Sequence, residues 1–225
     1  MVVLVTAAAS FPGRKGFVGA LLKRHPEITT IVQNINSRST SVVLGEEERI
    51  LYGSGKIEDV LLGNRYQISS KSFYQINHEQ CEVLYRKALA PLELKGTETL
   101  LDAYCGIGTI ALSAAGHVKQ VIGVESNKQA VRDAISNAKN NRIGNARFIC
   151  DDAAHYMEEA AVRKQRFDVV VMDPPRSGSS EQFIKACARV RAGKIVYISC
   201  DPRTQLRDLA VFKRLGYEGN TIIPV

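Results

Sequence analysis

Hydrophobic and polar positions follow two different rhythms along the chain. Up to about residue 70, short runs rich in β-branched residues alternate with glycines and charged turns, a pattern typical of short strands. The clearest of these runs are 28–33, 41–44 and 49–52. They predict a small α+β element over residues 1–70.

From residue 78 onward, compact apolar runs alternate with amphipathic stretches. Alanine, valine and isoleucine at 130, 131, 134, 135 and 138 recur at helical spacing between two such runs. This alternation predicts βαβ crossovers and a parallel sheet. We therefore expect residues 71–225 to form an α/β domain with a doubly wound, mostly parallel, Rossmann-like sheet. Its predicted strands are 98–103, 120–125, 146–150, 167–172 and 194–199.

A glycine-rich turn follows the first of these five strands. Gly106 and Gly108 let the backbone turn tightly and approach a ligand at the start of the following helix. The next strand ends in Glu125, where a carboxylate is placed to accept ribose hydroxyls. Ala111 occupies the third glycine position of a dinucleotide fingerprint, which tolerates alanine, so the turn alone does not exclude NAD.

Carboxylates follow four of the predicted strands. Asp102, Glu125, Asp152 and Asp173 should all lie at the carboxyl edge of the sheet. Asp173 opens the stiff turn Asp-Pro-Pro-Arg, which projects into the crevice there. Four acids on one edge favour a cationic, hydroxyl-rich ligand such as S-adenosylmethionine.

The cysteines point to a nucleophile instead of a metal site. There are five, scattered singly without a Cys-x-x-Cys pair, which argues against disulfides and zinc. Cys200 follows the fifth strand and directly precedes Asp201 and Pro202, a helix cap with proline at the first helical position. A helix N-terminus stabilises a thiolate, so Cys200 is the candidate nucleophile. The remaining cysteines are interpreted as inert packing residues: Cys81, Cys105, Cys150 and Cys187.

The charge balance fits a protein that touches a polyanion. Thirty Lys and Arg against twenty-three Asp and Glu give a net charge of +7, although a solvated basic face gives the same count. Arg203 and Arg207 are candidate contacts to an RNA backbone. Apolar runs stay well below the length of a membrane span, and no secretory pattern opens the chain. We expect a cytoplasmic protein without membrane contact.

Four motifs together resemble the bacterial 23S ribosomal RNA (uracil-5-)-methyltransferase family. They are Ser-Phe-Tyr-Gln-Ile-Asn at 72–77, Leu-Asp-Ala-Tyr-Cys-Gly-Ile-Gly-Thr at 101–109, Asp-Pro-Pro-Arg at 173–176 and Ser-Cys-Asp-Pro at 199–202. Their order and spacing match over about residues 60–225, and the first 60 residues resemble the family's central domain. The resemblance implies a methyltransferase sheet and a ribosomal RNA substrate.

The resemblance also implies roles for individual residues. Gln75, Tyr104, Glu125 and Asp173 would contact S-adenosylmethionine, and Cys200 would attack the base. The chemistry requires such a nucleophile, because C5 of uracil is too electron-poor to attack a methyl sulfonium unaided. Thiolate addition at C6 of uracil makes C5 nucleophilic, and a general base of the enzyme later removes the C5 proton. The target uridine must first leave its stack.

The chain departs from the family pattern at both ends. The family carries a small RNA-binding barrel and, in some members, an iron–sulfur cluster before this region. It continues after it with a Phe-Pro-His-Thr-type segment leading to a glutamate base, whereas this chain stops at 225. We therefore expect slow release of a covalent adduct. We also expect a last strand near 217–223 and, beside it, an unpaired sheet edge through which two chains can pair.

Two other interpretations stay open from the sequence. An amino-group nucleic-acid methyltransferase also uses an acidic-Pro-Pro turn but does not need Cys200. A catalytically incomplete module that binds cofactor or RNA is the second. Replacing Cys200 by alanine separates them, because methylation that survives the change favours the first and cofactor binding without an adduct favours the second.

Overall fold

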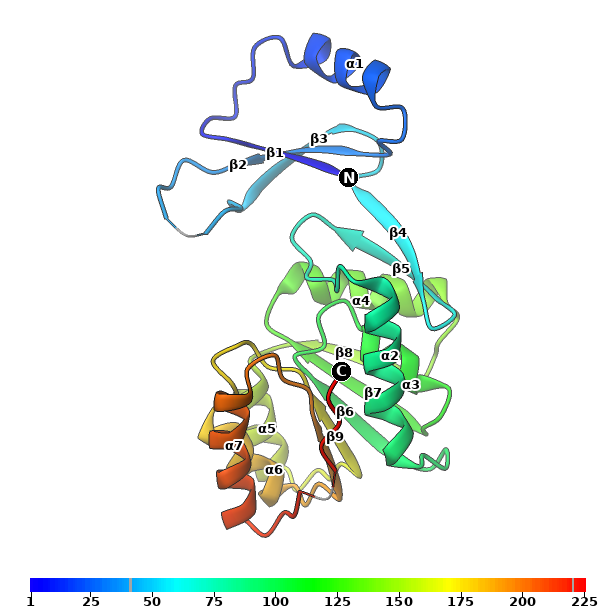
Figure 1. The fold of residues 1–225 in the computed structure, drawn as a ribbon, viewed down its shortest axis with the longest axis vertical. Helices are drawn as coiled ribbons and strands as arrows, with labels where there is room; N and C mark the ends of the chain where they lie inside the picture. Colours follow the sequence, from blue (N-terminus) through cyan, green and yellow to red (C-terminus); the bar gives the residue numbers. More distant parts are fainter. Residues whose placement is uncertain (41, 220) are drawn as a thin grey trace. The chain divides into compact units, whose positions relative to one another are not determined.

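The computed structural model describes residues 1–40, 42–219 and 221–225. The chain divides into two compact units, each with its own sheet (Figure 1). The first unit consists of Met1–Asp59 with Gln67–Ser72, and the second of Val60–Tyr66 with Phe73–Val225.

The first unit is built on a three-stranded sheet in the order β1-β2-β3. Strands β1 and β2 are parallel and joined through α1, whereas β3 is antiparallel to β2. Central β2 is buried at four of its five residues. The elements are β1 (Val2–Thr6), α1 (Arg14–Arg24), β2 (Ile31–Ile35) and β3 (Glu47–Tyr52).

Two of the three strands predicted in this unit are confirmed with shifted bounds. The run 28–33 corresponds to β2, and 49–52 is part of β3. The prediction for 41–44 is wrong at 42–44, which are not in a strand, while Ser41 lies outside the described residues. The Asn36 side chain donates to the carbonyls of Val42 and Val43 at 2.8 and 3.0 Å, so a side chain occupies the acceptors that a neighbouring strand would use.

A two-stranded sheet of β4 (Lys56–Leu61) and β5 (Asn64–Ser69) contributes residues to both units. Leu62 and Gly63 join the strands, with φ angles of 48° and 82°. Two successive positive φ angles are the signature of a tight hairpin turn whose twist matches that of the flanking strands.

The second unit contains a five-stranded parallel sheet in the order β10-β9-β6-β7-β8. The predicted doubly wound, Rossmann-like sheet is therefore confirmed. Its strands are β6 (Thr99–Ala103), β7 (Gln120–Glu125), β8 (Ala146–Cys150), β9 (Val169–Met172) and β10 (Lys194–Tyr197). The helical elements are α2 (His78–Leu89), the 3₁₀ turn η1 (Ala90–Leu92), α3 (Thr109–Ala115), α4 (Lys128–Asn140), α5 (Ala153–Val162), α6 (Glu181–Arg189) and α7 (Pro202–Arg214).

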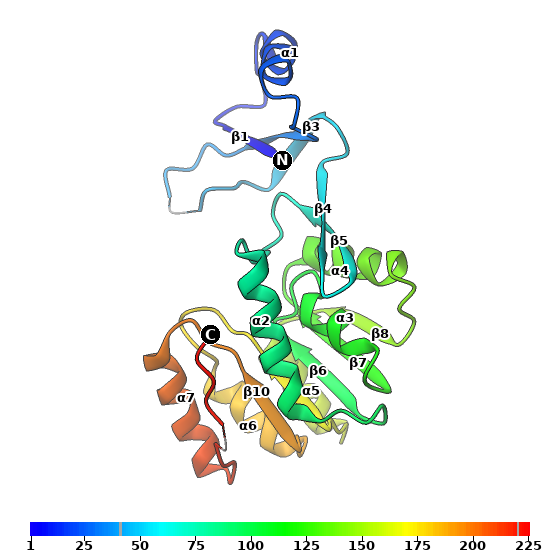
Figure 2. The same cartoon turned by 45° about the vertical axis from the view of Figure 1, so that its right-hand side comes forward.

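Helices cover both faces of this sheet. Figures 1 and 2 show α2, α3 and α4 on one side and α5, α6 and α7 on the other. On the second side, Leu101, Val170 and Met172 of the strands pack with buried Phe183 of α6 and Phe212 of α7. Since successive strand residues point to opposite faces, the alternate residues face the side of the sheet that α3 and α4 cover. The two helix layers leave the carboxyl edge of the strands as the place for a ligand.

Three predicted strands differ at their ends. The strand predicted from 98 begins at Thr99, and the one predicted from 167 begins at Val169; at these ends the Asp168 side chain accepts from the Thr99 amide at 2.8 Å. The one predicted to 199 ends at Tyr197. Ser199 then pairs with Asp201, its hydroxyl donating to the Asp201 carbonyl and accepting from the Asp201 amide. Side-chain hydrogen bonds thus lie at the start of β6 and just after the end of β10.

The strand predicted near 217–223 is wrong for the described residues 217–219 and 221–223, and Asn220 lies outside the described residues. Tyr217 instead closes the end of α7. Its hydroxyl donates to the carbonyls of Cys187 and Ala192 at 3.2 and 3.0 Å, and its ring packs edge-on against Phe212 at 5.6 Å. Among the described strands, β10 pairs with β9 alone and forms one edge of the sheet.

Within the described part of the chain, none of the helices combines the length and apolar character needed to cross a membrane.

Candidate active site

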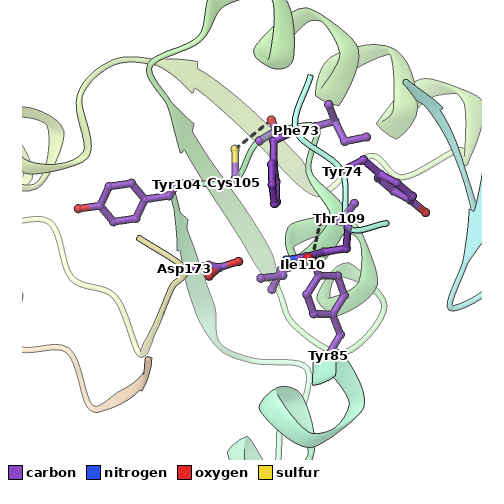
Figure 3. Close-up of a pocket in the computed structure, with 11 residues that line it drawn as sticks. Phe73, Tyr74, Tyr85, Tyr104, Cys105, Thr109, Ile110 and Asp173 are labelled. Carbon is purple, nitrogen blue, oxygen red and sulfur yellow. Dashed lines mark hydrogen bonds between the residues drawn. The ribbon is translucent and has the colours of Figure 1, made fainter. Parts of the chain in front are cut away.

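A pocket opens beside the carboxyl ends of β6 and β9. Gln75 and Asp173 line it together with four aromatic residues, Phe73, Tyr74, Tyr85 and Tyr104. In Figure 3 the Asp173 carboxylate and the rings of Phe73 and Tyr85 face a common space, whereas the Tyr104 ring extends to the other side. Four predicted cofactor contacts, Gln75, Tyr104, Gly106 and Asp173, are therefore brought together.

The turn between β6 and α3 forms the floor of this pocket. Tyr104 and Gly106 have φ angles of 66° and 55°, which reverse the chain within a few residues. The Gly106 amide donates to the Glu125 carboxylate at 3.1 Å, and Glu125 also accepts from the Asn127 amide at 2.7 Å. Glu125 thus holds the turn from the end of β7, close to the pocket but outside the set of residues that line it.

The two glycines of the turn have different surroundings. A Cβ atom on Gly106 would meet nothing within 4 Å, and Gly106 lines the pocket. A Cβ on Gly108 would lie 2.9 Å from the Phe148 ring, and one on neighbouring Gly123 would lie 2.6 Å from the same ring. Gly108, predicted at the cofactor, therefore makes room for a packed aromatic side chain.

Replacing Gly108 by alanine should lower the free energy of unfolding by about 1–3 kcal/mol. Its φ of 86° is unfavourable for alanine, and the added methyl group overlaps Phe148. Gly106→Ala is the matched control, because it has a positive φ but open space around it. Urea denaturation of both variants measures the difference, and equal destabilisation would contradict a packing role for Gly108.

Asp173 is an acid without a partner in the pocket. Among the described residues its carboxylate has no hydrogen-bonding or ion-pair partner, and burial raises its pKa to about 6. Asp102 lies nearby on β6, fully buried, with Oδ2 accepting from the Ala111 amide at 2.8 Å and Oδ1 without a partner among the described residues. Burial raises the pKa of Asp102 to about 8, and the nearby charges of Asp173 and Glu125 add to this shift.

Phe73 and Tyr85 are among the pocket residues that were not predicted individually as ligand contacts. Phe73 lines the opening and is 74% exposed, although it lies within the recognised motif at 72–77. Tyr85 comes from α2, and its hydroxyl lies 3.1 Å from the Thr109 hydroxyl at the start of α3. Helical spacing within α2 could have indicated that Tyr85 is buried, but nothing local to it indicates a ligand.

Cys200 is exposed and immediately precedes α7. The predicted cap is present, since the Asp201 side chain accepts from the Arg203 amide at 2.9 Å and Pro202 begins the helix. Cys200 does not itself line the pocket around Asp173. Cys81, Cys105 and Cys187 are buried as expected, but Cys150 is exposed at the end of β8, so its interpretation as a buried cysteine is wrong.

Asp152 serves as the cap of α5. Its carboxylate accepts from the amides of Ala154 and His155 at 2.9 and 3.0 Å, which satisfies the open end of that helix. Asp152 lies outside the residues that line the pocket. In the described part of the chain, no three His, Cys, Asp or Glu side chains come together as ligands for a metal ion.

Comparison with known proteins places this geometry in a family. The model of the tRNA (uracil-5-)-methyltransferase family matches residues 34–215. The chain belongs to the tRNA (uracil-5-)-methyltransferase family. This membership agrees with the resemblance that the four sequence motifs indicate.

Curated relatives agree with this assignment. A protein from Streptococcus mutans, described as an uncharacterized RNA methyltransferase, is 43% identical over all of this chain and 50% of its own length. One from Halalkalibacterium halodurans with the same description is 41% identical over all of this chain and 49% of its own length. The chain thus spans about half the length of the curated relatives it matches.

A solved structure supports the fold. The tRNA (uracil-54, C5)-methyltransferase of Pyrococcus abyssi, in complex with S-adenosyl-L-homocysteine, matches with a TM-score of 0.73 and 29% identity. The match covers 93% of this chain and 48% of that protein.

Proposed function

We propose that the chain transfers a methyl group from S-adenosylmethionine to C5 of a uridine in RNA. The observation that carries the proposal is the unpartnered Asp173 carboxylate in an aromatic pocket at the carboxyl edge of the sheet. A partly buried acid without a partner favours a cationic ligand, and aromatic faces attract cations and stack with nucleobases. The S-adenosylhomocysteine complex of the Pyrococcus abyssi relative supports this choice of cofactor.

Different residues are proposed to bind different parts of S-adenosylmethionine. Asp173 and Gln75 are polar groups that fit the hydrogen-bond donors of the cofactor, and Glu125 ends β7 where ribose hydroxyls bind in sheets of this type. Asp102 beneath the turn stays mostly protonated at neutral pH, because burial raises its pKa to about 8. Asp173 is then the main negative charge that faces the ligand.

Cys200 is proposed to activate the target uracil ring. Its thiolate adds to C6 of uracil, forming a C–S bond and shifting the electron pair of the C5–C6 double bond toward C5 and O4. Bound S-adenosylmethionine would supply an electrophilic methyl group: the C5–methyl bond forms as the sulfur–methyl bond breaks, and S-adenosylhomocysteine leaves with the electron pair. The C5 proton then leaves to a base, and the C–S bond breaks to expel the cysteine thiolate. Exposed Phe73 at the opening offers an aromatic face for an unstacked nucleotide.

The class of RNA is part of the same proposal. The motif resemblance favours ribosomal RNA, which we propose as the substrate. Transfer RNA is the alternative, because it appears in the name of the matched family and of the Pyrococcus abyssi enzyme.

Nucleoside analysis after incubation with S-adenosylmethionine tests both the methylated position and the class of RNA that is proposed as substrate. Unmodified transcripts of 23S ribosomal RNA and of transfer RNAs are incubated separately, digested and analysed by mass spectrometry. We expect 5-methyluridine in the ribosomal digest. Its appearance only in transfer RNA would correct the substrate class, and a methylated amino group on any base would overturn the uracil-5 assignment.

A further inference from the structure

Helix α7 holds the loop that follows β9. The Thr204 hydroxyl donates to the Arg176 carbonyl at 3.1 Å, and the Arg207 guanidinium donates to the carbonyls of Ser177 and Ser179 at 2.9 and 3.3 Å. Three of four consecutive carbonyls in the loop are therefore bound by two side chains of one helix. Arg207, predicted from the sequence to contact RNA, directs these donors to the protein itself.

Asp208 is the centre of this arrangement. It is buried, with 1% of its surface exposed. One carboxylate oxygen accepts from the Ser179 amide and from the Tyr197 hydroxyl, both at 2.7 Å, and the other pairs with Arg207 at 2.7 Å. A buried carboxylate is stable only when it is paired and hydrogen-bonded, and these donors satisfy it.

Gly178 shows how closely the loop approaches the helix. Its φ is 77°, and a Cβ atom there would lie 2.5 Å from the Arg207 guanidinium and 2.6 Å from the Asp208 carboxylate. Side chains other than hydrogen do not fit at this distance. We call this contact the α7 clamp, formed by Thr204, Arg207 and Asp208 with residues 176–179.

The α7 clamp joins the parts of the proposed site that the pocket itself does not connect. The clamped loop begins after Asp173, and the Ser179 hydroxyl lies 3.2 Å from the Tyr104 hydroxyl. The helix begins directly after Cys200. The clamp is thus a short rigid path from two pocket residues to the cysteine.

We propose that Asp208 is a positioning residue that keeps Cys200 in register with Asp173 and Tyr104 during methyl transfer. The inference rests on the proposed function. Methyl transfer requires the base, held at C6 by the cysteine, to present C5 to the methyl group of a cofactor held by the pocket. Misplacement by about 1 Å in such a geometry costs about a hundredfold in rate.

Asp208→Asn tests the clamp with little change in size. The side-chain amide of asparagine has one acceptor and one donor end, so its donor must face either Arg207 or the Ser179 amide, both of which are donors. We expect single-turnover methyl transfer to slow by about 10- to 100-fold, while the Kd for S-adenosylhomocysteine changes by less than about threefold.

Tyr197→Phe is the matched control. It removes a buried hydrogen bond to the same carboxylate but leaves the loop contacts of Asp208 and Arg207 in place. We expect it to lower stability without slowing methyl transfer by more than about twofold. A normal rate in Asp208→Asn, or rates in both variants that fall only in proportion to their stability, would overturn the positioning role.

Hydrogen exchange gives a readout that does not depend on RNA methylation. If the clamp couples pocket to cysteine, binding of S-adenosylhomocysteine should slow amide exchange in residues 200–208 of the wild-type chain, and Asp208→Asn should abolish this slowing. If the wild-type chain binds S-adenosylhomocysteine without slower amide exchange in residues 200–208, the positioning role of the α7 clamp is contradicted, even if RNA is methylated. Slower exchange in these residues on binding, together with no methylation of RNA, supports the coupling through the clamp and contradicts the proposed uracil-5 activity.

Discussion

Replacing Cys200 by alanine should reduce methyl transfer to RNA by about a thousandfold or more and leave the affinity for S-adenosylhomocysteine unchanged. Without thiolate addition at C6, C5 of uracil is not nucleophilic, so the chemical step itself fails. The cofactor pocket should be unaffected, because Cys200 is exposed and does not line it. Single-turnover transfer of a labelled methyl group and calorimetric titration measure the two quantities.

Cys150→Ala is the matched control for this result. Cys150 is also exposed, but it lies at the end of β8 and has no proposed role in the reaction, whereas Cys200 lies between the end of β10 and the start of α7. We expect its methylation rate to equal that of the wild type. Methylation that survives in Cys200→Ala would instead favour an amino-group methyltransferase, which uses the Asp-Pro-Pro turn without a nucleophile.

Asp173→Asn should weaken S-adenosylmethionine binding by about 10- to 100-fold at pH 7.5, which corresponds to about 1.4–2.7 kcal/mol. The pocket then loses its main negative charge. The pKa of Asp173 is raised to about 6 by burial, so in the wild type the carboxylate is ionised above this pH and protonated below it. A cation binds the ionised form, and wild-type affinity should therefore fall roughly tenfold per pH unit as pH drops below about 6.

The pH profile also separates Asp173 from its acidic neighbours. Asp102, whose pKa burial raises to about 8, stays mostly protonated between pH 5 and 7, so its ionisation changes little there. Asp168→Asn is the control, because Asp168 directly precedes β9 whereas Asp173 directly follows it. We expect the S-adenosylmethionine affinity of Asp168→Asn, measured by calorimetry at each pH, to match that of the wild type. A pH dependence below 6 that persists in Asp173→Asn would contradict the assignment.

The parallel sheet could be predicted from the sequence because its strands are short and almost wholly apolar. The predicted bounds of β7 and β8 match the structure, and both strands are followed by polar residues that end them. The elements β1 and α1 were not predicted individually. Helix α1 has no buried residue, so it lacks the apolar stripe on which a helix prediction depends.

Much of the candidate site was also accessible from sequence motifs. Gln75, Tyr104 and Asp173 lie in separate motifs and meet in one pocket; Tyr104 and Asp173 both follow strands of the parallel sheet and so lie at the same edge. The roles of Gly108 and Asp208 were not accessible, because they depend on contacts with residues distant in sequence. Phe148 fills the space beside Gly108, and the loop at 176–179 satisfies Asp208. Such contacts leave no local pattern in the chain.

The most direct test of the central claim is a denaturing gel of the chain incubated with S-adenosylmethionine and a 5-fluorouridine-containing fragment of ribosomal RNA. Fluorine at C5 cannot leave as a proton does, so the adduct to C6 is trapped. We predict a slowly migrating protein–RNA band in the wild type that is absent in Cys200→Ala. No band in the wild type, with S-adenosylmethionine shown to bind, would contradict the covalent uracil-5 mechanism for this chain.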